Sequence, residues 1–170
     1  MSRTSLPIGV FDSGVGGLTV FQELSRQLPD EGLTYLGDTA RVPYGTRSSE
    51  TVVRYSERVA GRLVSTGVKA LVVACNTAST WALSILEDRG RELGIPVLGV
   101  IVPGVEQALA ATRNGQVAVI GTEGTIRGGE YERQLHQRTP EVVVTSFACP
   151  LLVALAEEGW TDGDVARAVV

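Results

Sequence analysis

Short apolar runs alternate along the chain with longer segments in which apolar residues recur every three or four positions. A continuous apolar run of four to six residues is typical of a strand that is buried on both faces of a parallel sheet. The longer segments have the period of helices that bury one face. We therefore predict an α/β fold with parallel sheets and six strands, over 6–11, 33–36, 70–74, 96–100, 117–120 and 142–146.

Helix signals fill the intervals between these strands. Ser48 or Ser49 can cap a helix whose inner stripe is Val52, Ser56, Val59 and Leu63. The stripe Leu18, Phe21, Leu24 and Leu28 predicts an earlier helix that Pro29 ends. Thr77 is the predicted cap of a single helix that reaches Leu93, and Gly94 closes it. Further helices are predicted over 105–112, 129–138 and 150–158, with a last helical turn near Asp162.

Charge and cysteine content exclude several classes of function. The 170 residues carry a net charge of -4, which disfavours broad binding to nucleic acid or to an anionic membrane. Two cysteines do not make a disulfide framework, and one histidine without a Cys-x-x-Cys pair makes a zinc site improbable. We expect no metal, and a soluble cytoplasmic protein with reduced thiols.

The strand over 70–74 runs directly into Cys75, Asn76 and Thr77, followed by a helix pattern. Ligands of open α/β proteins bind at the carboxyl ends of such strands, where the next helix offers free backbone N–H groups. A thiol there can be a reactive acid or base. Simple burial of a cysteine at a strand end is the competing interpretation, and the two are evenly matched on this stretch.

Asp12 begins the turn Asp12-Ser13-Gly14-Val15-Gly16-Gly17 at the end of the first strand. The turn has neither the lysine of a P-loop nor the glycine spacing of a dinucleotide site, and its carboxylate would repel phosphate. A carboxylate there suits a substrate ammonium or an acid–base role. Asn76 and Thr77 could hold a substrate carboxylate while also capping their helix. Cys149 is predicted to pack in a core, and His136 to lie on a solvated helix face.

Five motifs together resemble the glutamate racemase family. In chain order they are Asp12-Ser13-Gly14-x-Gly16-Gly17, Gly37-Asp38-x3-Val42-Pro43-Tyr44-Gly45, Ala74-Cys75-Asn76-Thr77-Ala78, Gly121-Thr122-x-Gly124-Thr125-Ile126 and Cys149-Pro150-Leu151. The resemblance implies two similar flavodoxin-like α/β domains. It also implies a cofactor-independent racemase in which two cysteines transfer protons on opposite faces of the α-carbon of glutamate. Such an enzyme supplies D-glutamate for peptidoglycan.

The resemblance also assigns roles to individual residues. Cys75 is similar to the first catalytic cysteine, and Asp12 to a substrate-binding carboxylate that assists it. The remaining implied substrate contacts are Ser13, Tyr44, Gly45, Asn76 and Thr77 in the first half, and Thr122, Thr125 and Glu157 in the second.

One family motif, Gly-Cys-Thr-His with the second catalytic cysteine, does not occur in this sequence. We therefore expect an N-terminal part of such a racemase: a first domain over 1–97 without its C-terminal return segment, and a partial second domain over 98–170. The two-thiol mechanism is incomplete in this chain. A partial second domain should also expose apolar surface between Val142 and Leu155.

Two alternatives stay open on the residues alone. One is a related racemase for another amino acid such as aspartate, because these motifs do not fix side-chain specificity. The other is a non-catalytic protein that binds an amino acid or a protein partner with half of a site. The expected partner is a small-molecule substrate, glutamate, with no direct contact to nucleic acid or membrane and with a homodimer left open.

Overall fold

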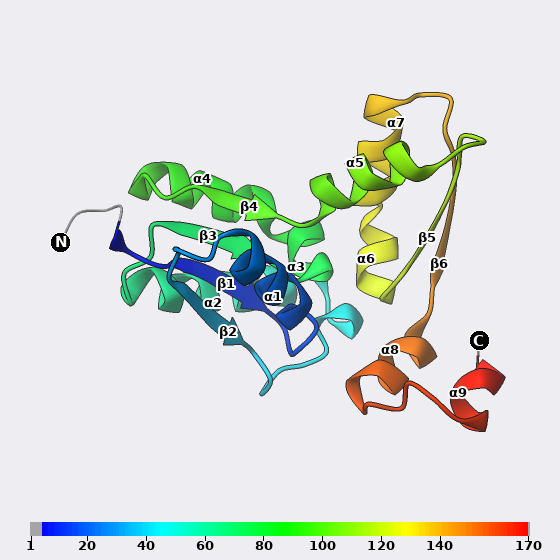
Figure 1. The fold of residues 1–170 in the computed structure, drawn as a ribbon, viewed down its shortest axis with the longest axis horizontal. Coiled ribbons are helices and arrows are strands. Elements are labelled where there is room, and N and C mark those ends of the chain that lie inside the picture. Colours follow the sequence, from blue (N-terminus) through cyan, green and yellow to red (C-terminus); the bar gives the residue numbers. More distant parts are fainter. Residues whose placement is uncertain (1–4, 170) are drawn as a thin grey trace. The chain divides into compact units, whose positions relative to one another are not determined.

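The computed structural model describes residues 5–169, and the chain divides into two compact units, Met1–Ile101 and Val102–Val170. The first unit is built on a four-stranded sheet with the strand order β2-β1-β3-β4 (Figure 1). All of its pairings are parallel, and Val10 of β1 lies opposite Tyr35 of β2 and Val72 of β3. The strands are β1 (Ile8–Asp12), β2 (Leu33–Gly37), β3 (Ala70–Val73) and β4 (Val97–Gly99).

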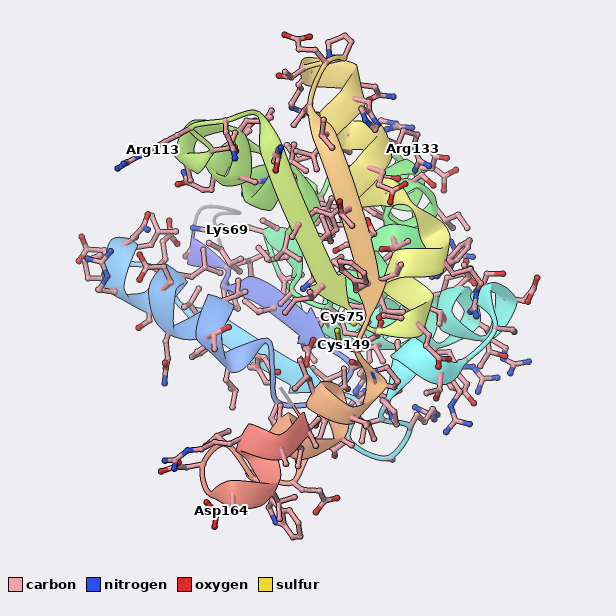
Figure 2. All side chains as sticks on the ribbon, turned by 90° about the vertical axis from the view of Figure 1, so that its right-hand side faces the viewer. Lys69, Cys75, Arg113, Arg133, Cys149 and Asp164 are labelled. Carbon is pink, nitrogen blue, oxygen red and sulfur yellow. The ribbon has the colours of Figure 1, made fainter. Side chains whose placement is uncertain are left out.

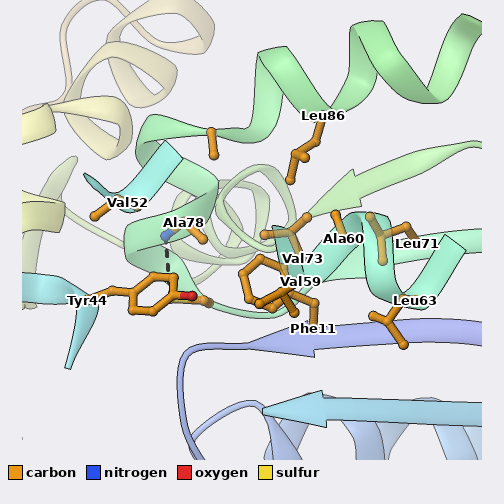
Figure 3. Close-up of a cluster of buried hydrophobic side chains, with 12 residues drawn as sticks. Phe11, Tyr44, Val52, Val59, Ala60, Leu63, Leu71, Val73, Ala78 and Leu86 are labelled. Atoms are coloured by element: carbon orange, nitrogen blue, oxygen red, sulfur yellow. Dashed lines mark hydrogen bonds between the residues drawn. The ribbon is translucent and has the colours of Figure 1, made fainter. Parts of the chain in front are cut away.

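The core of the first unit lies between this sheet and the helices α2 (Ser49–Ser65) and α4 (Leu83–Leu93) (Figure 3). Alternate strand residues face these helices because side chains along a strand point to opposite sides. The predicted stripe of α2 is buried as expected, and Ser48 caps the helix by accepting a hydrogen bond from the backbone N–H of Thr51. The buried cluster consists of Phe11, Tyr44, Val52, Val59, Ala60, Leu63, Leu71, Val73, Cys75, Ala78, Ala82 and Leu86.

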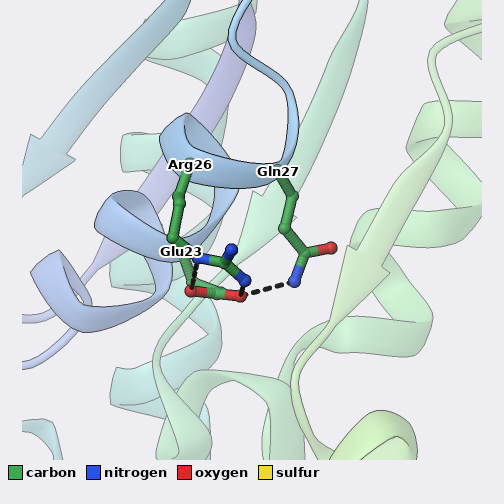
Figure 4. A network of polar contacts seen from close by, with 3 residues as sticks. All are labelled: Glu23, Arg26 and Gln27. Carbon is green, nitrogen blue, oxygen red and sulfur yellow. Dashed lines mark hydrogen bonds and ion pairs between the residues drawn. The ribbon is translucent and has the colours of Figure 1, made fainter.

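The opposite face of the sheet carries α1 (Leu18–Gln27), which buries little (Figure 1). Phe21 packs edge-on against Tyr35 with ring centroids 5.8 Å apart. The outer side of α1 carries a small polar network in which Glu23 accepts hydrogen bonds from Arg26 and Gln27 (Figure 4). These bonds lower the pKa of Glu23 to about 2. None of the residues of α1 is fully buried, so this helix is the weaker of the two layers.

The segment after β3 differs from the sequence prediction. A single helix from a Thr77 cap to Leu93 is wrong, because α3 (Asn76–Trp81) and α4 are separated at Ala82, where φ is -115°. The N-cap is Cys75, whose extended backbone lets its sulfur accept the N–H of Ala78. Thr77 therefore lies inside the first turn and is buried. Gly94 ends α4 in the left-handed conformation, as predicted.

The second unit has a two-stranded parallel sheet, β5 (Gln116–Gly121) and β6 (Val143–Ala148). Its helices are α5 (Ile101–Ala111), which begins at the boundary residue, and α6 (Glu123–Gly128), α7 (Glu130–Arg138), α8 (Pro150–Glu157) and α9 (Asp164–Val169). The predicted helix around 129–138 is preceded by a separate helix, α6, and Gly129 joins the two with φ +66°. All six predicted strands are present.

The second unit leaves much of its apolar surface uncovered. Phe147 is 55% exposed and Leu151 is 65% exposed, as expected for the segment between Val142 and Leu155. Cys149 is only half-buried, so the prediction that it packs in a core is wrong. No helix in residues 5–169 is long and apolar enough to cross a membrane.

Candidate active site

Three strands of the first unit end close together, and the residues that follow them carry the polar chemistry. The backbone N–H of Ala74 donates to the carbonyl of Phe11 at 2.8 Å, which ties the end of β3 to the end of β1. The N–H of Asp38 donates to the carbonyl of Asp12 at 3.0 Å, which ties β2 to β1. Parallel pairing therefore brings Asp12, Asp38 and Cys75 to one edge of the sheet, where open α/β proteins bind ligands. Figure 2 labels Lys69, which precedes β3, and Cys75, which follows it.

Cys75 is held by short polar contacts in a buried position. Its side chain lies 3.4 Å from the Ser13 hydroxyl, and its sulfur accepts the N–H of Ala78, also at 3.4 Å. Burial raises the pKa of the thiol, and the negative charge of Asp12 raises it further. The contacts with Ser13 and Ala78 oppose this shift. In the resting site the thiol is therefore neutral at physiological pH.

Asp12 is buried at the end of β1 and fixed by its own turn. One carboxylate oxygen accepts the N–H of Gly14 at 2.8 Å. Gly17 closes the other side: a Cβ there would lie 2.6 Å from the Cβ of Asp12 and 3.0 Å from that of Ala74. The absence of a side chain at Gly17 thus lets the first turn of α1 approach the carboxylate.

A second buried carboxylate, Asp38, was part of a recognised motif but was not predicted as a site residue. It accepts hydrogen bonds from Arg41 Nη1 at 2.8 and 2.9 Å and from the Tyr44 hydroxyl at 2.7 Å. Its place after β2, with an arginine three residues later, is the sequence signal that could have found it. Arg41 also lies over the ring of Tyr55 in α2, at 5.2 Å from the ring centroid.

The predicted substrate contacts of the first unit differ in accessibility. Tyr44 is 1% exposed, and its hydroxyl faces Asp38 rather than solvent. Burial, and then Asp38, raise the pKa of Tyr44 well above its usual range, and the charge of Cys75 contributes, so the phenol stays protonated. Gly45 is also buried, next to it in the short 3-10 turn Tyr44–Thr46. Asn76 is exposed, and Ser13 is half-buried beside the sulfur.

The remaining predicted residues belong to the second unit. Thr122 caps α6, and its hydroxyl lies 3.0 Å from that of Thr125, which is buried. Glu157 is exposed at the end of α8. His136 is on an exposed part of α7, and its ring lies 3.1 Å from the carbonyl oxygen of Val142. Thr122 and Thr125 are brought together at the start of α6.

The residues that the structure describes contain no cluster of three or more His, Cys, Asp or Glu side chains suited to a metal ion. The polar groups around Cys75 are instead an acid–base thiol, a carboxylate, hydroxyls and backbone N–H groups. This is a set suited to binding a small zwitterion and moving a proton.

Comparison with known proteins identifies the family of this chain. The family described as Asp/Glu/Hydantoin racemase matches residues 8–170. A glutamate racemase of Geobacter metallireducens is 59% identical over 160 residues, which cover 94% of this chain and 58% of that protein. The structure of a Bacillus anthracis glutamate racemase, RacE1, matches with a TM-score of 0.92 and 44% identity over 98% of this chain and 61% of that one.

A Francisella tularensis glutamate racemase solved in complex with D-glutamate matches with a TM-score of 0.90 and 40% identity, over 98% of this chain and 61% of that one. The chain belongs to the Asp/Glu/hydantoin racemase family, a family of isomerases. Within it, these relatives are glutamate racemases, as the motifs predicted. The chain spans about three-fifths of their length.

Proposed function

We propose that this chain carries one half of the active site of a glutamate racemase, with Cys75 as the acid–base that exchanges the α-proton of glutamate. The observation that carries the proposal is the placement of Cys75: a buried sulfur at the end of β3, beside Ser13 and the N–H of Ala78. The identity of 40–59% to glutamate racemases supports the choice of substrate. A likeness to an aspartate racemase homologue at 19% identity concerns the fold alone.

Substrate binding would use the groups around the sulfur. The carboxylate of Asp12 complements the α-ammonium of glutamate by charge. Ser13, Asn76 and Thr77 supply hydroxyl and amide groups that suit a carboxylate. Tyr44 and Gly45 would border the substrate from the loop after β2.

The proton step follows from the charge balance at the sulfur. Before glutamate binds, burial and Asp12 hold the pKa of Cys75 high. An ammonium group placed at Asp12 cancels that negative charge and favours the thiolate, and the proton of the thiol passes to solvent. The thiolate then takes the α-proton, and the electron pair of the broken C–H bond passes into the substrate carboxylate. The new S–H group exchanges its proton with solvent, and return of a proton to the same face restores the original enantiomer.

Inversion requires a second acid–base on the opposite face of the α-carbon. Thr122, Thr125 and Glu157 are the substrate-binding residues that we propose within the second unit. A homodimer, action in the cytoplasm and supply of D-glutamate to peptidoglycan belong to the same proposal. The reaction expected from this chain itself is therefore exchange of the α-proton from one face.

The test is loss of the α-proton signal of D- or L-glutamate in deuterated water, followed by NMR, alongside circular dichroism for inversion. We expect exchange of one enantiomer without inversion, abolished in Cys75→Ala and kept in Cys149→Ser. Inversion that depends on Cys75 would contradict the half-site. An absence of both exchange and glutamate binding would contradict the assignment of function, and exchange of aspartate at an equal rate would contradict the choice of substrate.

A further inference from the structure

An ion pair between a buried aspartate, Asp38, and a half-exposed arginine, Arg41, lies in the loop between β2 and α2. Asp38 has a side chain that is 6% exposed, whereas that of its partner Arg41 is 40% exposed. A carboxylate so deeply buried is unfavourable unless it is paired and hydrogen-bonded. Arg41 and the hydroxyl of Tyr44 satisfy it together.

Each hydrogen-bond partner of Asp38 also contacts an aromatic ring. Arg41 lies over the ring of Tyr55, and Tyr44 packs with its ring centroid 5.7 Å from that of Tyr55 and 6.4 Å from that of Phe11. The backbone N–H of Asp38 is bonded to the carbonyl of Asp12. The pair thus links the loop to α2, to the core and to the residue that ends β1.

We propose that Asp38 is a positioning residue: paired with Arg41, it fixes Tyr44 and Gly45 beside Cys75 without itself exchanging a proton with substrate. This rests on the proposed function for the identity of the substrate, but the placement concerns the loop alone. The positive charge of Arg41 is required because it offsets a carboxylate that would otherwise be buried without a counter-charge.

Tyr44 is the physical connection between the pair and the thiol. It belongs to the same buried cluster as Cys75, and its ionisation is coupled to the charges of both Cys75 and Asp38. The charged or titratable groups around the sulfur are therefore Asp12 from β1 and Tyr44 from the loop, with Asp38 and Arg41 behind Tyr44. Removing Arg41 leaves the buried carboxylate without its counter-charge, which destabilises the hydrogen bond that holds Tyr44 in the cluster with Cys75.

The experiment uses the full chain with Cys149→Ser, so that iodoacetamide alkylates Cys75 alone. Two readouts are taken for each variant: the alkylation rate between pH 7 and 10, and the D-glutamate concentration that halves that rate at pH 8. The variants are Arg41→Met, Arg41→Lys and Asp38→Asn. Arg91→Met is the matched control, because Arg91 pairs with Asp88 at the same three-residue spacing on an exposed helix face.

We expect Arg41→Met to change the alkylation rate at pH 8 by about threefold or more, because it displaces the Tyr44 ring that shares the buried cluster with the thiol. We expect Arg41→Met and Asp38→Asn to raise the protective D-glutamate concentration about tenfold. Arg41→Lys should recover most of both effects, and Arg91→Met should change neither.

Unchanged alkylation profiles and unchanged protection in Arg41→Met and Asp38→Asn would overturn the proposal. So would equal effects in Arg41→Lys and Arg41→Met, because a purely steric role does not depend on charge. If Asp38→Asn does not fold, the pair of Arg41 variants decides. If D-glutamate fails to protect the parent chain, the proposed substrate is wrong, and the alkylation profile alone then decides the role of the pair.

Discussion

The two units differ in how completely each sheet is covered. In the first, four strands carry a continuous buried cluster under α2 and α4. In the second, two strands leave Ile120 at 64%, Val143 at 57% and Phe147 at 55% exposed. A sheet needs three or more strands, or helices on it, to be stable by itself. The unit that holds Cys75 is thus the one with the complete core, and a preorganised site needs such support.

The largest expected effect on stability comes from truncating a phenylalanine in the first sheet, and it is compared with the same change in the second sheet. Phe11 is fully buried in β1, and Phe147 is 55% exposed in β6. Phe11→Ala should lower the free energy of unfolding by about 3–5 kcal/mol, because it leaves a cavity in the core. Phe147→Ala should change it by less than about 0.5 kcal/mol. Urea unfolding followed by circular dichroism measures both, and equal losses would show that the exposed strand is covered in solution.

A smaller effect is expected at the turn before α1. Gly17→Ala places a methyl group against Asp12 and Ala74, whose short side chains cannot move away, and should cost about 1–3 kcal/mol. It should also reduce the protection of Cys75 by D-glutamate. Gly16→Ala is the control, because a Cβ there meets nothing within 4 Å. Thermal unfolding and the alkylation assay should separate the two variants, and an indistinguishable pair would contradict the close approach at Gly17.

A substitution at Ser56, in the first unit, should raise the stability of the fold. The Ser56 hydroxyl is fully buried in α2 and makes no hydrogen bond among the described residues. Ser56→Ala should therefore raise the free energy of unfolding by about 1 kcal/mol, since it removes a desolvated polar group at little change in volume. Chemical denaturation measures the change. A loss of stability would show that the hydroxyl has a partner in solution.

The smallest effect concerns alkaline pH. Because the folded state raises the pKa of Cys75, the unfolded chain releases that proton first as the pH rises. Stability from this group is complete below about pH 8.5, the value of an unfolded thiol, and is lost as the pH rises toward the folded pKa. Tyr44 adds a loss in the same direction above about pH 10. In a Cys149→Ser background, Cys75→Ser should reduce the slope of the unfolding free energy against pH between pH 8 and 10. An unchanged slope would contradict the burial of the thiol.

The sequence predicted the strands well because their signal is local. An apolar run followed by glycine or a polar turn, as at 70–74 before Cys75, has few alternatives. The cap at Ser48 was equally local. The Thr77 cap failed because cysteine is a weak hydrogen-bond acceptor and is not an expected N-cap residue. The hydrogen bond from the Tyr44 hydroxyl to Asp38 was not predictable, since it depends on Tyr44 folding back across the loop.

The sulfur of Cys75 is both the proposed acid–base and the cap of α3. A reaction at that atom therefore affects a backbone hydrogen bond. An adduct on the sulfur removes the acceptor for the N–H of Ala78. An electrophilic inhibitor aimed at this cysteine would therefore leave two marks, a blocked thiol and faster hydrogen exchange at one amide. The second mark reports occupancy of the sulfur without any assay of turnover, so the Ala78 amide can be used to monitor covalent ligands.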